Sequence, residues 1–219
     1  MNLLDKIGYA LYGNCCILCG DVLDIESEHE VCGECDTLLR SHLQNQAIVI
    51  NDISISADKF LFSYNNKLLR HLVLEMKDDP LKKYCSYFAR IASECIEKDP
   101  AFSDFDIVTY CPRKPSKARI IGYDHSCLFA EYISRFTGKS FLQLLKRREG
   151  GKEQKKVKRI NDRVENIQNK FYFNNECNCK GKTVLMVDDI ITSGSTAKEC
   201  ARILKKAGAA RVLALFILD

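Results

Sequence analysis

Hydrophobic and polar residues along this chain alternate between the period of a strand and the period of a helix. Apolar residues alternate with the period of a strand in two groups, first Ile48, Ile50, Ile53 and Ile55 and then Phe60, Phe62 and Tyr64, which predicts two strands. Helical spacing follows in 67–76 and in 84–95, with Pro80 between the two segments. The remaining predicted elements are helices over 3–12 and 36–43, from 125 onward and from 162 onward, and strands over 106–111, 139–145, 171–173, 184–187 and 212–217.

The clearest strand signal is the compact apolar run Val184–Val187. A short continuous run of this kind is typical of a parallel strand that is buried on both faces. A helical pattern follows it, with Ala197, Cys200 and Leu204 on one face. This order of strands and helices predicts an α/β fold, a mostly parallel sheet flanked by helices.

Two carboxylates and a small-residue turn lie between this strand and this helix. Asp188 and Asp189 come directly after the apolar run, and the turn Thr192–Thr196 is rich in hydroxyl groups. Ligands of open α/β sheets lie beyond the carboxyl ends of the strands, where a helix N-terminus suits a phosphate. The carboxylates would repel a phosphate placed beside them. The ligand must therefore carry hydroxyl groups at a distance from its phosphate, and a ribose phosphate meets that requirement.

Near the amino terminus, Cys16-x-x-Cys19 is followed by Cys32-x-x-Cys35, a spacing that can place four thiolates around one ion. Four cysteines leave no open position for a substrate, so a structural zinc is favoured. The alternatives are free buried thiols, a redox pair or an iron–sulfur cluster, and Cys15 could replace Cys16. We expect a zinc module over 1–45 and the main domain over 46–219.

Composition and charge narrow the picture in two ways. No apolar run approaches the ~20 residues of a membrane-spanning helix, and the first residues make a poor signal peptide, so we expect a cytoplasmic protein without a membrane span. The formal net charge of +4 is unevenly distributed, because the segment from Lys146 to Arg163 is strongly basic. Its glycine pair, Gly150-Gly151, predicts a mobile loop.

The central stretch closely resembles the 5-phosphoribosyl-1-pyrophosphate (PRPP) motif of type I phosphoribosyltransferases, with Ser193 as a mild variant. The chain as a whole resembles the ComF family, which joins a four-cysteine zinc module to such a domain. A further series that fits the family is Gln154, Arg163, Asn166 and Phe171. The resemblance implies PRPP bound with Mg²⁺, through Asp188, Asp189, Ile190, Thr192, Ser193, Gly194, Ser195 and Thr196. Arg113 and Lys114 would meet the pyrophosphate, and the 150–158 loop would close over the site.

The corner that opens the helix from 125 departs from the family string R-G-F-N-Q. Ile121 stands where the arginine is expected, although Arg119 is close, and Asp124 and His125 replace the asparagine and the glutamine. The added carboxylate disfavours a pyrophosphate there unless magnesium or a nearby arginine compensates. Asp124 also suits the N-cap of the helix that follows.

Two functions follow from the resemblance. In the first, the protein binds PRPP, or another ligand containing ribose 5-phosphate, and transfers the phosphoribosyl group to a nitrogen nucleophile. In the second, it is a non-catalytic protein that handles single-stranded DNA, with competence proteins as partners in DNA uptake. The basic segment supplies cations but no aromatic residue for stacking on bases.

Overall fold

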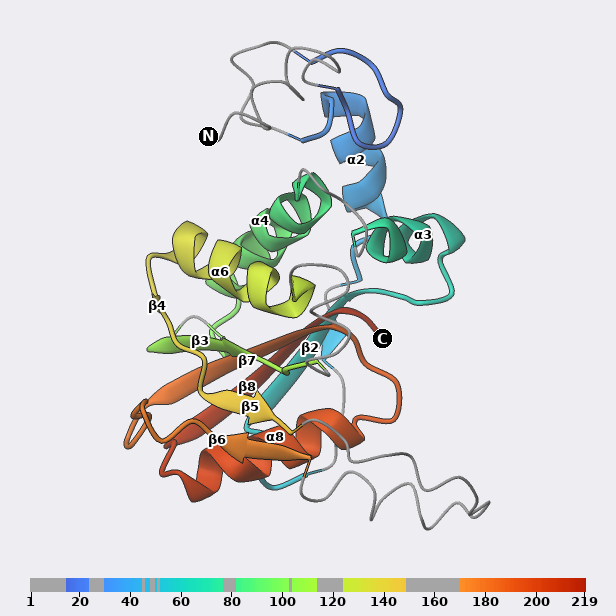
Figure 1. Ribbon diagram of the computed structural model, residues 1–219. Helices are drawn as coiled ribbons and strands as arrows, with labels where there is room; N and C mark the ends of the chain where they lie inside the picture. Colours follow the sequence, from blue (N-terminus) through green and yellow to red (C-terminus); the bar gives the residue numbers. More distant parts are fainter. Residues whose placement is uncertain are drawn as a thin grey trace.

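The fold is a six-stranded sheet with helices on both faces (Figure 1). The structure is a computed structural model. It describes residues 15–23, 30–44, 46–47, 50, 52–76, 82–102, 104–113, 124–148 and 170–219. Several predictions of the sequence lie outside these residues: the helices from 3 and from 162, the 150–158 loop, Lys114, Ile121, Gln154, Arg163 and Asn166.

The sheet is parallel except at one edge. Its order is β1-β2-β8-β7-β3-β4, and only the pair β1–β2 is antiparallel. This confirms the predicted mostly parallel α/β fold. The strands are β1 (Gln46–Ala47), β2 (Ala57–Phe62), β3 (Ile107–Tyr110), β4 (Ser140–Phe141), β7 (Thr183–Ile190) and β8 (Arg211–Leu218).

Residues of the buried central strand face two separate cores in alternation. In β7, Leu185 and Val187 join the core under α3 (Lys67–Glu75), α4 (Lys83–Glu97) and α6 (His125–Thr137). Val184 and Met186 join the core under α8 (Ser195–Lys206) on the opposite face (Figure 1). A continuous apolar run therefore serves both faces, as expected of a parallel strand covered on each side.

A second, two-stranded sheet lies beside α8. It consists of β5 (Leu145–Arg147) and β6 (Phe171–Phe173), paired antiparallel. The segment 171–173 is thus a strand, as predicted, but it pairs with β5 rather than with an edge of the main sheet. The single strand predicted over 139–145 is in fact two short strands, β4 and β5, which belong to different sheets.

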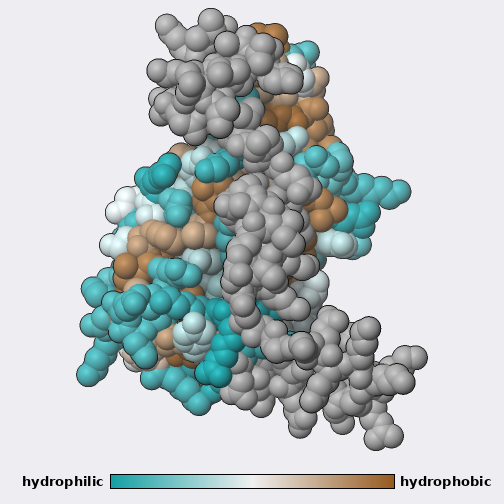
Figure 2. All heavy atoms as spheres, in the orientation of Figure 1, coloured by the Kyte–Doolittle hydropathy of each residue, from teal (hydrophilic) through white to brown (hydrophobic). Residues whose placement is uncertain are grey.

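The amino-terminal helix α2 (Gly33–Ser41) is held against α4 by charged side chains. The two terminal nitrogens of Arg40 donate to Glu94 at 2.6 and 3.1 Å, and its Nε donates to Asp36 at 2.7 Å. Tyr87 of α4 donates its hydroxyl to the same Asp36 at 3.1 Å. Hydrophobic surface lies on this upper part of the molecule, whereas hydrophilic surface covers much of its lower left (Figure 2).

Two predictions about strands need correction. Of the first predicted strand, the described residues Ile50, Ile53 and Ile55 are not in a strand: Ile53 is fully exposed in a turn, and the backbone N–H of Ile50 donates to Asp58 of β2. Strand β7 extends beyond the apolar run and includes Asp188 and Asp189, which the pattern placed after the strand. The backbone there pairs with β8 up to Ile190 and Leu218, so both carboxylates project from a rigid strand end.

Candidate functional site

The end of β7 and the start of α8 form a small pocket. It is lined by Asp188, by Ile190 to Ala197 and by Phe216 from the neighbouring β8. Its volume is about 60 Å³, and a single water molecule needs roughly 10–15 Å³ on the same scale. The pocket therefore accepts a group the size of a phosphate, and a larger ligand would extend out of it.

The turn that closes the pocket depends on a glycine. Gly194 is the N-cap of α8 and has a φ of 68°, a left-handed conformation that costs other residues free energy. No side chain caps this helix end. The hydroxyls of Ser193 and Ser195 lie 2.9 Å apart beside it. Unpaired N–H groups and hydroxyl donors around a helix N-terminus are favourable partners for an anion.

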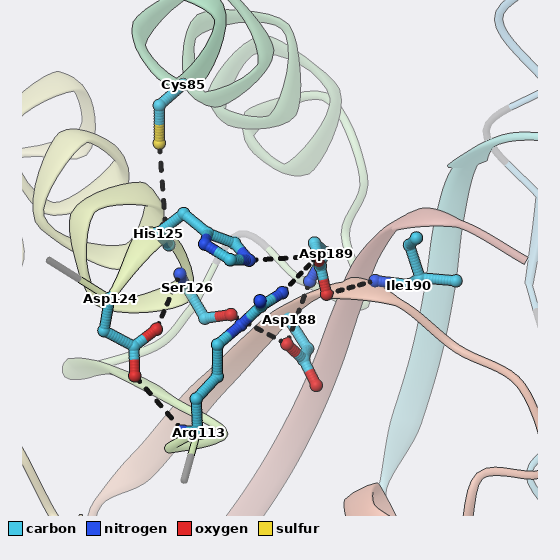
Figure 3. A network of polar contacts seen from close by, with 8 residues as sticks. All are labelled: Cys85, Arg113, Asp124, His125, Ser126, Asp188, Asp189 and Ile190. Carbon is cyan, nitrogen blue, oxygen red and sulfur yellow. Dashed lines mark hydrogen bonds and ion pairs between the residues drawn. The ribbon is translucent and has the colours of Figure 1, made fainter. Parts of the chain in front are cut away.

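The second carboxylate, Asp189, faces away from this pocket toward β3 and α6 (Figure 3). Its Oδ2 accepts from Arg113 at 2.5 Å and lies 3.2 Å from Nε2 of His125. Its Oδ1 accepts from the N–H of Ile190 at 2.9 Å. Asp189 is buried, so this ionised group depends on the cation and donors around it.

Asp188 has neutral donors in place of a cation. Its Oδ1 accepts from the hydroxyl of Ser126 at 2.9 Å and from the N–H of Asp189 at 3.0 Å. Burial and the neighbouring charge of Asp189 raise the pKa of Asp188 well above its ordinary value, against the smaller opposing effects of Ser126 and Arg113. A ligand that supplies hydroxyl donors or a cation would favour the ionised form.

Asp124 fixes the corner between β3 and α6. One oxygen caps the helix by accepting from the N–H of Ser126 at 3.0 Å, and the other accepts from the N–H of Arg113 at 3.1 Å. Burial raises the pKa of Asp124 despite these donors. The predicted N-cap is confirmed, and the same carboxylate ties the two ends of the 114–123 connection together.

The structure thus divides the residues that the sequence grouped together. Asp188, Ile190 and the turn 192–196 surround one pocket, whereas Asp189 and Arg113 pair with each other on the side of α6. Two residues at the start of α6, His125 and Ser126, were not predicted to touch the carboxylates. They precede the two carboxylates by 64 and 62 residues in the chain, so no local pattern in the sequence connects them. The one available clue was that His125 stands where the resembling ComF string has a glutamine.

The four predicted metal ligands come together at the amino-terminal end. The sulfur atoms of Cys16, Cys19, Cys32 and Cys35 all lie within 4.8 Å of one another, and those of Cys19 and Cys32 are 3.8 Å apart. Four thiolates at about 2.3 Å from a tetrahedral zinc would be ~3.8 Å apart. The cluster therefore has the dimensions of a closed zinc site.

Backbone donors prepare one of these thiols for a metal. Burial acts to raise the pKa of Cys16, but backbone N–H groups, among them that of Leu18 at 3.5 Å, lower it to about 7. A thiol must lose its proton to bind zinc, so these donors favour binding. Cys15 lies outside the cluster, and its backbone forms an isolated β-bridge with Val22. Cys16 rather than Cys15 is the ligand that the geometry supports.

Among the helices that the structure describes, none has the length and apolar character needed to cross a bilayer. No curated protein matches the chain. The chain is similar in structure to an allosteric regulatory enzyme of purine biosynthesis and to the glutamine PRPP amidotransferase of B. subtilis. Each is 19% identical over 68% of this chain and 30% of theirs, with TM-scores of 0.48 and 0.47.

Adenine phosphoribosyltransferase from Leishmania tarentolae is similar over 90% of this chain and 89% of its own length, with 13% identity and a TM-score of 0.41. A family model described as "Phosphoribosyl transferase domain" matches residues 126–219. That match runs from the first turn of α6 through both carboxylates and the α8 turn to the end of β8. The part of the chain that forms the pocket therefore lies within the residues that match this family model.

Proposed function

We propose that this protein binds PRPP through the end of β7 and the start of α8. The observation that carries the proposal is the pocket itself, in which the carboxylate of Asp188 and the turn 192–197 line one small space. A carboxylate favours hydroxyl donors, while the helix N-terminus favours a phosphate. A ribose 5-phosphate presents both groups at a distance from each other, so the sugar would lie against Asp188 and its 5′-phosphate against the turn.

The remaining residues that were predicted to bind PRPP would act on its pyrophosphate. Arg113 lies at the carboxyl end of β3, next to the acids, where a pyrophosphate could take it from Asp189. Asp189 would then accept a ribose hydroxyl in place of the arginine. Lys114 follows Arg113 in the sequence and is proposed for the same pyrophosphate. Mg²⁺ would accompany the pyrophosphate, because its hard oxygen ligands are phosphates and carboxylates.

The reaction that this arrangement suits is transfer of the phosphoribosyl group. A nitrogen nucleophile would form a bond to C1 of the ribose as the bond from C1 to pyrophosphate breaks, and the pyrophosphate leaves with the bonding electron pair. The protein would contribute positioning and electrostatic stabilisation. The amino-terminal part, which we propose to be a separate ComF-like zinc module over 1–45, would take no part in this chemistry.

Calorimetric titration with PRPP and Mg²⁺ tests the proposal. Asp188→Asn and Asp189→Asn should each weaken binding about ten- to a hundredfold, because a hydrogen bond to a charged group is worth roughly 1.5–3 kcal/mol. Ribose 5-phosphate should compete with PRPP. Asp104→Asn is the matched control, because Asp104 is exposed and precedes the amino-terminal end of β3, whereas Asp188 and Asp189 lie at the carboxyl end of β7.

The proposal fails if the wild-type protein shows no binding at millimolar PRPP. It also fails if both variants at the end of β7 bind as tightly as the Asp104→Asn control. Release of pyrophosphate only when an amine or a nucleobase is added would identify the protein as an enzyme. Tight binding without release would leave it as a PRPP-binding protein.

A second function, handling of single-stranded DNA during competence, is supported by the small sheet β5–β6. Arg147 lies over the ring of Phe171 at 5.0 Å, and Arg148 lies over the ring of Tyr172 at 5.6 Å. The strand opposite the start of the basic segment therefore supplies the aromatic residues that the segment lacks. Phe171 is buried and Tyr172 is exposed, so Tyr172 beside Arg148 is the ring on which a base could stack. Affinity for an oligonucleotide that falls steeply with salt and falls further in Tyr172→Ala would favour this function.

A further inference from the structure

The first turn of α6 supplies one hydrogen-bonding side chain to each carboxylate at the end of β7 (Figure 3). His125 approaches Asp189, with 3.2 Å between Nε2 and Oδ2. Ser126, the next residue, donates to Oδ1 of Asp188 at 2.9 Å. Two consecutive residues of one helix thus hold two consecutive residues of one strand. The role of His125 and Ser126 rests on the proposed function, because they contact the two carboxylates proposed to bind PRPP.

The partners of Asp189 differ in how easily a ligand can reach them. The side chain of His125 is fully buried, whereas that of Arg113 is 22% exposed. Both contact the same oxygen, Oδ2, and Oδ1 is occupied by the N–H of Ile190. A ligand arriving from solvent can therefore take the place of Arg113. It cannot take the place of the histidine.

The position of His125 is itself fixed by its surroundings. Asp124 caps the helix at this point, and α6 packs along α4. From α4, the thiol of Cys85 donates to the backbone carbonyl of His125 at 3.7 Å. An ionised carboxylate only accepts hydrogen bonds, so Nε2 must carry the proton in the contact with Asp189. The imidazole is a rigid donor whose direction is set by the packing of two helices.

We infer that His125 is a positioning residue, which holds the carboxylate of Asp189 in place to accept a ribose hydroxyl when Arg113 leaves it for the pyrophosphate. Without this donor, Asp189 would lose its orientation at the moment when its charged partner is withdrawn. A charged group near a reacting centre must be held to within a fraction of an ångström and a few degrees, and buried neighbours provide that restraint. Ser126 restrains Asp188 in the same way.

Two variants separate the hydrogen bond from the packing. His125→Leu fills the buried space but has no donor, while His125→Gln keeps a side-chain N–H group at a similar distance from the backbone. In calorimetry with PRPP and Mg²⁺, His125→Leu should bind tenfold or more weakly than wild type, and His125→Gln should recover most of the loss. His71→Leu is the control, because His71 is exposed on α3. Equal binding by the Leu and Gln variants, at either level, would overturn the inference.

A measurement without any ligand separates this inference from the proposed function. In protein labelled with ¹⁵N-histidine, Nε2 of His125 should be protonated and protected from solvent exchange, and its resonance should move in Asp189→Asn. A resonance that ignores this substitution would overturn the inference, whatever PRPP does. If wild type fails to bind PRPP while the resonance responds to Asp189→Asn, the proposed function fails and the His125–Asp189 restraint stands.

Discussion

Replacing Asp188 by asparagine should weaken PRPP binding but make the folded protein more stable at neutral pH. Burial and the adjacent Asp189 raise the pKa of this carboxyl above its ordinary value of 3.8. The folded protein therefore binds a proton at Asp188 more readily than the unfolded chain does. This favourable contribution is complete below about pH 4 and is lost as the pH rises toward the folded pKa. An asparagine has no such cost, so Asp188→Asn should be more stable than wild type at neutral pH.

The size of the effect follows from the linkage between protons and folding. One pKa unit corresponds to about 1.4 kcal/mol, which is also the steepest change that a single carboxyl can produce per pH unit. Asp188 borders an open pocket and accepts two hydrogen bonds, which reduce the penalty. We therefore expect the advantage of Asp188→Asn over wild type to be small at pH 4 and to grow by at most about 1.4 kcal/mol per pH unit as the pH rises.

Urea denaturation at several pH values between 4 and 8 measures this difference. Asp99→Asn provides a control of opposite sign, because a hydrogen bond from Lys59 lowers the pKa of Asp99. That variant should lose stability throughout this range, because the contribution of Asp99 is fully present above its ordinary pKa of 3.8 and is lost only below it. If Asp188→Asn is no more stable than wild type at any pH in this range, the explanation that burial and Asp189 destabilise the ionised form of Asp188 is refuted.

Two further outcomes are expected. Elemental analysis should find one zinc per chain, and iron in place of zinc would contradict this. Cys32→Ser should lose much of the ~10–16 kcal/mol that a structural zinc contributes, while PRPP binding persists. Gly194→Ala should lower the free energy of unfolding by about 1 kcal/mol, because its φ is 68°, and should also weaken PRPP binding. Gly138→Ala, at a φ of 67° with open space around it, should cost similar stability and leave binding unchanged, and equal binding by the two variants would remove the α8 turn from the site.

Features that depend on neighbouring residues in the chain were predicted well from the sequence. The strand at 184–187, the helix that follows it and the four-cysteine cluster each rest on local spacing, and the structure contains all three. The alternation around Ile53 misled, because a turn of polar and apolar residues can imitate a strand. Whether a segment forms a strand depends on a partner strand elsewhere in the chain, and local periodicity does not describe that partner.

The parts of the site that escaped prediction are contacts between distant segments. Arg113 and Asp189 are 76 residues apart, and His125 and Asp189 are 64 apart. Phe171 and Tyr172 of β6 lie beside Arg147 and Arg148 only because β5 and β6 pair. The two carboxylates and the hydroxyl-rich turn could be identified from the sequence, but the sheet decides that Asp188 lines the pocket while Asp189 pairs with Arg113.

The central position of β8 has a consequence for how the protein acquires its structure. β8 lies between β2 and β7, yet it follows every other strand in the chain, and its contact with Ser56 spans 156 residues. Until β8 is synthesised, β1–β2 and β7–β3–β4 have no strand in common, and each half exposes an unpaired edge. Pairings over such long separations form slowly, since the intervening chain must first be ordered. The pocket between β7 and α8, which includes Phe216 of β8, therefore cannot be complete before β8 has joined the two halves.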